Sequence, residues 1–545
     1  MGLQELRTGY DMKVALIAPP FPLDEAPSPP LGLCYVAAAF REAGAEVILL
    51  DYIVEKYAPE KMRRSLEEFQ PDAVGTTAVT MNFKGAAEIL SDVKTFFPDL
   101  VTIIGGPHVT FDSADTLRQY PAIDVVALGE AESTIKEFTP QILNRKAWHS
   151  IQGISFLDGE TLINNERREF IKDLDSIAQP VRDILSVSRY LALGFPVSII
   201  TSRGCPYRCI FCQGTRMVGH KIRYREAEQI ADEIENILAL GFRRINIADD
   251  FFTSSKKRVR LLCEEIKRRN IKFEWAAFAR VNSVSHELLE MMMEVGCDTI
   301  SFGLESGNEE MLERVEKHMK LDQARKAAKI CKEVGMNVFS SFIVGLPGET
   351  KETLQETRDF AEELGTEFGY HFLAPLPGTP IRDEIEKFDL TIQSTDWDEY
   401  DANRAIVSTS KLNQQQMEEF VAEYEVGCQD HWNKTETNYR NGTANEMEIL
   451  KFESRQRLEF IFEVLSEDVI ELAAQNLPTT DGQSVTEGLT STLAVAAKKA
   501  NVVIDNKVIC QTVNHLVEQG YVIPDVDEGR HSWQWTQFPA AIRQQ

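Results

Sequence analysis

Eleven short apolar runs, arranged in two series, constrain the fold of this chain more than any other feature. Five of them fall within residues 13–130, and each ends in Gly, Pro or a small polar residue before an amphipathic stretch. Runs rich in Val and Ile are typical of parallel strands that are buried on both faces. We therefore predict an α/β protein whose residues 1–145 form a doubly wound, Rossmann-like domain.

Doubly wound sheets bind ligands at the carboxyl ends of their strands. Here those ends carry small or polar residues, namely Thr76, Thr77, Val79, Thr80, Met81, Asn82, Gly105, Gly106, His108, Gly129 and Glu130. Some of the glycines could serve only to turn the chain. No G-x-G-x-x-G motif follows the first run, which argues against a dinucleotide. We expect a large, flat ligand between these small residues.

The second series holds six βα units within residues 191–385, each with polar or glycine-rich residues at the carboxyl end of its strand. A closed (β/α)₈ barrel needs eight units and places its active site at that same end. The pattern therefore predicts a partial (β/α)₆ barrel with an open side. We expect a connector at 146–190, a helical segment at 386–450 and a winged-helix-like domain at 451–545.

The formal net charge of −27 argues against general binding to nucleic acid, which requires clusters of Lys and Arg. Residues 450–545 hold 8 Lys and Arg against 13 Asp and Glu, so we expect their winged helix to contact protein or to be structural. The N-terminus lacks a signal-peptide pattern, and no apolar run approaches the roughly 18 residues of a membrane span. We expect a cytoplasmic protein without a membrane span.

Three of the nine cysteines, Cys205, Cys209 and Cys212, lie together in GCPYRCIFCQG directly after the first strand of the second series. Structural zinc requires four ligands, and His220 would be an unusually spaced fourth. Three buried cysteines without any cluster are the plainest alternative. An iron–sulfur cluster held by three thiolates leaves one iron with an open coordination site, which predicts a chemical role.

This C-x₃-C-x₂-C motif, with Phe211 before its last cysteine, resembles the motif of the radical S-adenosylmethionine (SAM) superfamily. The resemblance implies a [4Fe–4S] cluster on the three cysteines, with SAM bound to the fourth iron. It further implies contacts to SAM from residues on the successive strands that follow: Asp249, Asp250, Arg280, Glu305, Ser306, Gly345 and Gly348. Each of these could, taken alone, be an ordinary polar or turn residue.

The upstream stretches PPLGLCYVAAAFREAG, GGPH and GEAE resemble the cobalamin-binding class of that superfamily, and the likeness covers residues 13–385. No D-x-H-x-x-G motif is present, which implies that no histidine ligates cobalt, and we expect His108 to shape its loop or to bond the cofactor's tail. The class implies methylation of an unactivated carbon: one SAM yields the 5′-deoxyadenosyl radical, and a second remethylates cobalamin.

Several rivals remain open. A methylthiotransferase would need further cysteines before residue 145, where only Cys34 lies. A cobalamin-dependent cyclase or rearrangement enzyme acting on a tetrapyrrole, lipid or other small molecule shares every motif, and a cobalamin sensor with a winged-helix output is a third reading. We expect an electron donor of the flavodoxin or ferredoxin type and a small-molecule, peptide or protein substrate, for instance a glutamine of methyl-coenzyme M reductase.

Tyr370 is the one predicted catalytic residue, because it lies near the end of the sixth strand of the second series. Alternation along that strand places Tyr370 and Phe372 on one face and His371 on the other. We expect Tyr370 to lie between the 5′-deoxyadenosyl radical and cobalt and to help hold the substrate. The plainer alternative is that it packs in the core or at the rim.

Overall fold

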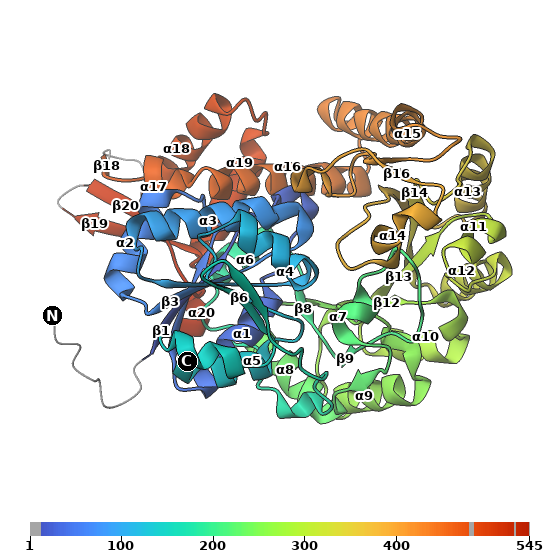
Figure 1. Ribbon diagram of the computed structural model, residues 1–545. Helices are drawn as coiled ribbons and strands as arrows, with labels where there is room; N and C mark the ends of the chain where they lie inside the picture. Colours follow the sequence, from blue (N-terminus) through green and yellow to red (C-terminus); the bar gives the residue numbers. More distant parts are fainter. Residues whose placement is uncertain (1–11, 479–483, 528–529, 544–545) are drawn as a thin grey trace.

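The computed structural model describes residues 12–478, 484–527 and 530–543, and Figure 1 shows their arrangement. An N-terminal α/β domain and a second parallel sheet lie side by side, and a largely helical C-terminal part lies along both. Residues 1–11 lie outside the described residues, and so do residues 479–483, 528–529 and 544–545. The expectation that the chain has no signal peptide was based on the first of these stretches.

The N-terminal domain is a seven-stranded sheet with helices on both faces. Its strands run in the order β2 (Glu46–Asp51), β1 (Lys13–Ala18), β3 (Ala73–Thr77), β4 (Val101–Gly105), β5 (Val125–Ala127), β6 (Ile154–Asp158) and β7 (Thr161–Asn164). Strands β1 to β5 are parallel, as predicted. Helices α1 (Leu31–Glu42) and α5 (Glu132–Phe138) pack on one face, and α2 (Pro59–Phe69), α3 (Phe83–Phe96) and α4 (Pro107–Gln119) pack on the other.

The segment 146–190 is not the irregular connector that we predicted. Strands β6 and β7 form an antiparallel hairpin that extends the N-terminal sheet beyond β5. The turn between them is Gly159-Glu160, directly after Asp158, and Gly159 has a φ of +61°. Glycine at the first position of a two-residue loop is a hairpin signal, and the many charges around it obscured this signal in the sequence.

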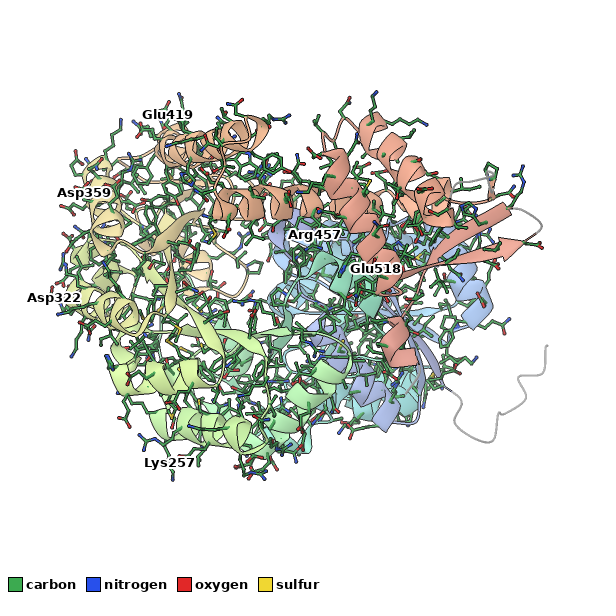
Figure 2. The ribbon with its side chains drawn as sticks, turned by 180° about the vertical axis from the view of Figure 1, so that it is seen from behind. Lys257, Asp322, Asp359, Glu419, Arg457 and Glu518 are labelled. Carbon is green, nitrogen blue, oxygen red and sulfur yellow. The ribbon has the colours of Figure 1, made fainter. Side chains whose placement is uncertain are left out.

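The second sheet has six parallel strands in the order β15 (Glu367–Phe372), β14 (Asn337–Val344), β13 (Cys297–Glu305), β12 (Glu274–Ala279), β11 (Arg244–Ile247) and β8 (Val197–Ile199). The two edge strands, β8 and β15, do not pair with each other, so the sheet is open, as the six βα units predicted. Its outer face is covered by α8 (Ala227–Ala239), α9 (Lys256–Arg268), α10 (His286–Glu294), α12 (Leu321–Val334) and α13 (Lys351–Leu364). Figure 2 shows charged side chains on the solvent side of this layer, among them Lys257, Asp322 and Asp359.

The two faces of the second sheet differ sharply in burial. Trp275, Ala277 and Ala279 of β12 are buried against the helices, whereas Phe278 between them is 52% exposed on the other face. On β15, His371 is exposed on that same inner face, beside Ile343 of β14. The inner face is therefore the accessible one.

Tyr370 does not face the inside of the partial barrel, so its predicted catalytic role is wrong. Its ring lies 5.1 Å from Phe420 and 5.3 Å from Tyr424, both on α15 (Gln414–Arg440), and burial raises its pKa to about 12. The alternation along β15 was predicted correctly, but it directs Tyr370 outward toward α15, which is distant from β15 in the sequence.

The C-terminal part begins with a short strand pair, β16 (Thr391–Ile392) and β17 (Val407–Ser408), before the two long helices α15 and α16 (Glu446–Ser466). Helix α16 crosses the domain boundary that we predicted at 450. After it come α17 (Val469–Ala473), β18 (Leu477–Pro478), α18 (Val485–Lys499), α19 (Asn506–Glu518), β19 (Val522–Asp527) and β20 (Arg530–Trp535). The three strands form one antiparallel sheet, and this order of elements fits the predicted winged helix.

The C-terminal part is joined to both α/β domains. Arg457 of α16, labelled in Figure 2, donates a hydrogen bond to the Ala192 carbonyl of α6 (Val187–Leu193). From the same short helix, the Tyr190 hydroxyl donates to the buried carboxyl of Asp51 at the end of β2 (2.9 Å). Within the described residues, no helix is both long and apolar enough to cross a bilayer.

We predict that Asp51 makes stability pH-dependent. Burial raises the pKa of Asp51 from its ordinary value of 3.8 to about 7, although the Tyr190 hydrogen bond opposes this shift. Because the folded protein holds the proton more tightly, ionising Asp51 costs stability as the pH rises from about 4 to about 7. Asp51→Asn should therefore gain stability over the wild type between pH 5 and pH 8 in urea titrations. An equal difference in unfolding free energy at both pH values would contradict this.

We also predict that substitutions at two neighbouring residues on β15 change the free energy of unfolding by very different amounts. Tyr370→Ala should lower the free energy of unfolding by about 2–4 kcal/mol, because it leaves a cavity in the aromatic cluster. His371→Ala on the exposed face should change it by less than about 0.5 kcal/mol. Urea unfolding followed by tryptophan fluorescence measures both. A neutral Tyr370→Ala substitution would show that the ring is not a packing residue.

Candidate active site

The three clustered cysteines lie in the loop between β9 (Ser202–Arg203) and α7 (Gly214–Val218). Cys209 is buried, Cys205 and Cys212 are partly exposed, and none of the three forms a disulfide. Gly204 starts the loop with a φ of +109°, and a Cβ there would lie 2.6 Å from the Lys221 carbonyl oxygen. Only glycine permits this close approach.

The cysteine loop is suited to binding iron. Burial raises the pKa of Cys205 and raises that of Cys212 to about 11, and a bound cation would displace the thiol protons. The Gly214 N–H donates to Cys212 Sγ (3.4 Å), a contact that would stabilise sulfur carrying negative charge. In the described part of the chain, no three His, Cys, Asp or Glu side chains converge on one metal ion. A four-iron cluster does not require convergence, because each thiolate bonds a different iron.

The adjacent acids that follow β11 differ in their surroundings. Both oxygens of Asp249 are used within the protein, since they accept hydrogen bonds from the backbone N–H and the hydroxyl of Thr201 and of Ser202 (2.5–3.0 Å). Asp249 therefore fixes the chain that leads into the cysteine loop rather than offering a free carboxylate to SAM. Asp250 accepts from the Gly204 N–H (3.1 Å) and borders a large cavity.

Arg280 lies beside the cysteine loop. Its guanidinium lies 3.5 Å from the ring centre of Tyr207, which belongs to that loop, and it donates to the Lys317 carbonyl. Its Nε is buried and has no hydrogen-bond partner. A buried donor without an acceptor carries a desolvation cost of about 1–3 kcal/mol, so this atom is suited to an anionic group of a ligand.

The neighbouring pair Glu305 and Ser306 is largely committed to internal contacts. Lys317 Nζ donates to Glu305 Oε1 (2.6 Å), and Glu305 has a left-handed backbone with a φ of +66° at an irregularity between β13 and β14. The Ser306 hydroxyl is fully buried against Thr357 Oγ1 (3.2 Å) and accepts from the Asn308 N–H (3.2 Å). Ser306 thus positions the start of α11 (Glu309–Arg314), and its hydroxyl is engaged within the protein rather than offered to SAM.

The glycine-rich turn after β14 is covered by other parts of the protein. A Cβ at Gly345 would lie 3.0 Å from Val407 of β17 and 3.3 Å from the Met417 sulfur of α15, and one at Gly348 would collide with Arg314. The resemblance implied that these glycines contact SAM. In the structure, protein side chains lie against these glycines instead. The glycines in this turn therefore reflect close packing against the C-terminal part.

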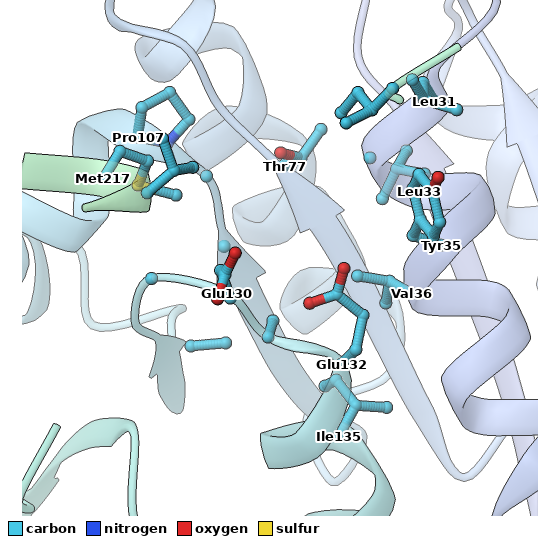
Figure 3. A pocket seen from close by; sticks show the side chains of 18 of the residues that line it. Leu31, Leu33, Tyr35, Val36, Thr77, Pro107, Glu130, Glu132, Ile135 and Met217 are labelled. Atoms are coloured by element: carbon cyan, nitrogen blue, oxygen red, sulfur yellow. The ribbon is translucent and has the colours of Figure 1, made fainter. Parts of the chain in front are cut away.

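A cavity of about 380 Å³ lies at the carboxyl edge of the N-terminal sheet (Figure 3). Of the predicted ligand-binding residues, Thr76, Thr77, Gly105, Gly106, Gly129, Glu130 and Asp250 line it. Its remaining walls come from α1, α5 and the chain around β9, including Tyr35, Glu132, Ser202 and Arg203. The cavity is therefore closed by the segment that leads into the cysteines, and its size is typical of a small-molecule site.

The other predicted residues at this edge lie outside the cavity. Val79, Thr80, Met81 and Asn82 are not among its lining residues; Thr80–Asn82 forms a 3₁₀ turn that packs on Trp397–Glu399. His108 is fully buried, stacks on Phe83 (4.1 Å) and lies 3.2 Å from Thr80 Oγ1. Burial and the charge of Arg382 lower its pKa to about 3. The His108 ring is thus held against Phe83 and Thr80.

A buried ion-pair network joins the cavity to the cysteine loop. Arg203 donates to Glu130 Oε1 (3.1 Å) and to Glu132 Oε1 (2.6 Å), and its β-ladder partner Arg223 donates to Glu130 Oε2 (2.9 Å). Burial alone would raise the pKa of Glu130, but Arg223 and Arg203 outweigh it and lower the pKa. Arg203 lies only two residues before Cys205 in the sequence. Sequence reasoning missed Arg203, Arg223 and Glu132, although Glu132 belongs to the GEAE stretch that carried the resemblance.

Comparisons with known proteins agree with this geometry. The model of the radical SAM superfamily matches residues 199–361, and that of the B12 binding domain matches residues 25–139. The uncharacterized methyltransferase PH0819 of Pyrococcus horikoshii is 33% identical over 378 residues, which are 68% of this chain and 82% of that protein. The anaerobic magnesium-protoporphyrin IX monomethyl ester cyclase of Cereibacter sphaeroides is 31% identical over 386 residues, 66% of this chain and 61% of the cyclase.

Among solved structures, the cobalamin-dependent SAM radical enzyme OxsB, with aqua-cobalamin and SAM bound, superposes with a TM-score of 0.67. The superposition covers 93% of this chain and 84% of OxsB at 18% identity, so it shows a shared fold. The two family models, the methyltransferase relative and this shared fold lead to one conclusion: the chain belongs to the cobalamin-binding class of the radical SAM superfamily.

Proposed function

We propose that this protein is a radical SAM C-methyltransferase that uses cobalamin to methylate an unactivated carbon. The observation that carries the proposal is the cavity shared by the two α/β domains, because the strand ends of the first domain and the chain that leads into the cysteines form one enclosure. When bound, the cluster and SAM would supply a carbon-centred radical, and cobalamin would supply the methyl group.

The residues around the cysteines support binding of the cluster and SAM. Cys205, Cys209 and Cys212 would hold the cluster, and the Gly214 N–H would stabilise the charge on Cys212 Sγ. The unpartnered Nε of Arg280 is a donor for the carboxylate of SAM, and Asp250 is an acceptor for its amino group. Asp249 and Ser306 act through the chain, because their polar atoms are engaged with neighbouring residues.

Small residues in the cavity wall leave space for cobalamin. At Gly32 and Gly129, which both line it, an added Cβ would meet no atom within 4 Å, so glycine there leaves open space for a ligand. His108 is stacked on Phe83 and does not line this cavity, so it is not positioned to ligate cobalt. This geometry supports the expectation that the cobalt has no histidine ligand.

The substrate would bind on the inner face of the second sheet. That face presents the exposed rings of Phe278 and His371 together with the hydroxyl groups of Ser301 and Ser341, whose strand positions alternate with the buried set. The rings and hydroxyl groups of this face would contact the reacting part of the substrate. A flavodoxin or ferredoxin would deliver the electron to the cluster.

A second candidate is a cobalamin-dependent ring-forming reaction, supported by the 31% identity to the cyclase of Cereibacter sphaeroides. The two candidates differ in how they consume SAM. Methylation yields S-adenosylhomocysteine together with 5′-deoxyadenosine, whereas ring formation has no methyl group to transfer. The product ratio therefore separates them.

The experiment is anaerobic reconstitution with iron, sulfide and cobalamin, followed by incubation with SAM carrying a labelled methyl group and separated cell fractions. We expect about four irons per chain, label in a non-SAM product, and both SAM-derived products. The fractions distinguish a small molecule from a protein acceptor, for which methyl-coenzyme M reductase is the first to test. Cys205→Ala/Cys209→Ala/Cys212→Ala should abolish the cluster's absorbance and SAM cleavage.

The matched control is Cys428→Ala/Cys510→Ala, which removes two exposed cysteines away from the loop and should retain the cluster. A full cluster in the triple variant would contradict the assignment of the cysteines. 5′-Deoxyadenosine without any S-adenosylhomocysteine, in the presence of a consumed acceptor, would favour the ring-forming alternative.

A further inference from the structure

Glu132, the first residue of α5, has one oxygen that the protein does not use. Its Oε1 accepts from Arg203 Nη2 at 2.6 Å, whereas its Oε2 is buried and has no hydrogen-bond partner. The side chain is only 8% exposed, so bulk water does not satisfy this oxygen. The carboxylate pairs with the Arg203 guanidinium, and a carboxylate oxygen can only accept hydrogen bonds.

The free oxygen belongs to the cavity wall. Glu132 lines the cavity, and Figure 3 shows its carboxylate extending from α5 into the space bordered by Thr77 and Val36. Glu130 also lines the cavity, but its oxygens are taken by Arg203, by Arg223 and by the Ile171 N–H. Of these two carboxylates at the cavity, only Glu132 has an oxygen left for a ligand.

The surroundings define what kind of donor fits. The side chains near Glu132 in the cavity wall are mainly apolar, among them Val36 and Ile135, and Arg203 already neutralises much of its charge. A cationic ligand group is therefore not required, and a neutral N–H donor is sufficient. Leaving a buried acceptor unsatisfied is costly, so a ligand that supplies such a donor is selected over one that does not.

We propose that Glu132 recognises a peripheral primary amide of the corrin, accepting a hydrogen bond from its NH₂ group on Oε2. This inference rests on the proposed function, because it assumes cobalamin in the cavity. It adds a specificity: the site distinguishes an amide from a carboxylate at one position of the corrin edge. A carboxylate there would place two negative oxygens side by side in a buried site.

The test measures binding without turnover. Absorbance titrations of the cluster-loaded protein compare cobalamin with its monocarboxylic acids, in each of which one peripheral amide has become a carboxylate. In the wild type, one of these acids should bind at least about tenfold more weakly than cobalamin, as expected for the loss of one charge-assisted hydrogen bond. In Glu132→Gln, whose amide can donate to a carboxylate, that discrimination should fall by at least about tenfold.

The matched control is Glu137→Gln on the same helix, because Glu137 pairs with Arg168 outside the cavity. It should keep the wild-type discrimination. If all monocarboxylic acids bind the wild type as tightly as cobalamin does, the inference is overturned, even if Glu132→Gln does not fold. If the wild type binds no cobalamin at all, the proposed function fails instead, so the two failures are distinguishable.

Discussion

The pairing of Arg203 with Glu130 and Glu132 is the interaction on which the geometry of the site depends. The arginine belongs to the strand that leads into the cysteine loop, and both acids belong to the carboxyl edge of the N-terminal sheet. Breaking a buried ion pair leaves an uncompensated charge and costs about 3–5 kcal/mol. The network therefore fixes the cysteine loop over the cavity, and arginine suits this task because its planar fork contacts both acids at once.

The C-terminal part packs on the glycine-rich turn after β14. Val407 and Met417 fill the space beside Gly345, so the glycine-rich turn cannot pack correctly without residues from β17 and α15. The Tyr190 contact with Asp51 ties the first domain to α6, which Arg457 of α16 contacts in turn. The extension is thus part of the scaffold that sets the distance between the two α/β domains, rather than a module attached to it.

Much of the architecture could be predicted from the sequence, because short Val- and Ile-rich runs and their polar ends are local signals. The cysteine loop and the strand ends that line the cavity were found in this way. Contacts between distant segments could not be, because no local pattern announces that α15 covers Tyr370, or that Thr201 and Ser202 occupy Asp249. The hairpin at Gly159 was missed because its turn signal lies among charged residues. The ion pairs of Arg203 were missed because they join residues of two different domains.

The central claim is that the cysteine loop and the cavity form a single site, with the cluster and cobalamin held close together by Arg203. The most direct test is the electron spin relaxation of bound cob(II)alamin, measured with the cluster oxidised and then reduced. We expect the reduced, paramagnetic cluster to shorten the relaxation time in the wild type and to do so less in Arg203→Met. Identical relaxation of cob(II)alamin in both oxidation states of the wild-type cluster would show that the two centres do not share a site.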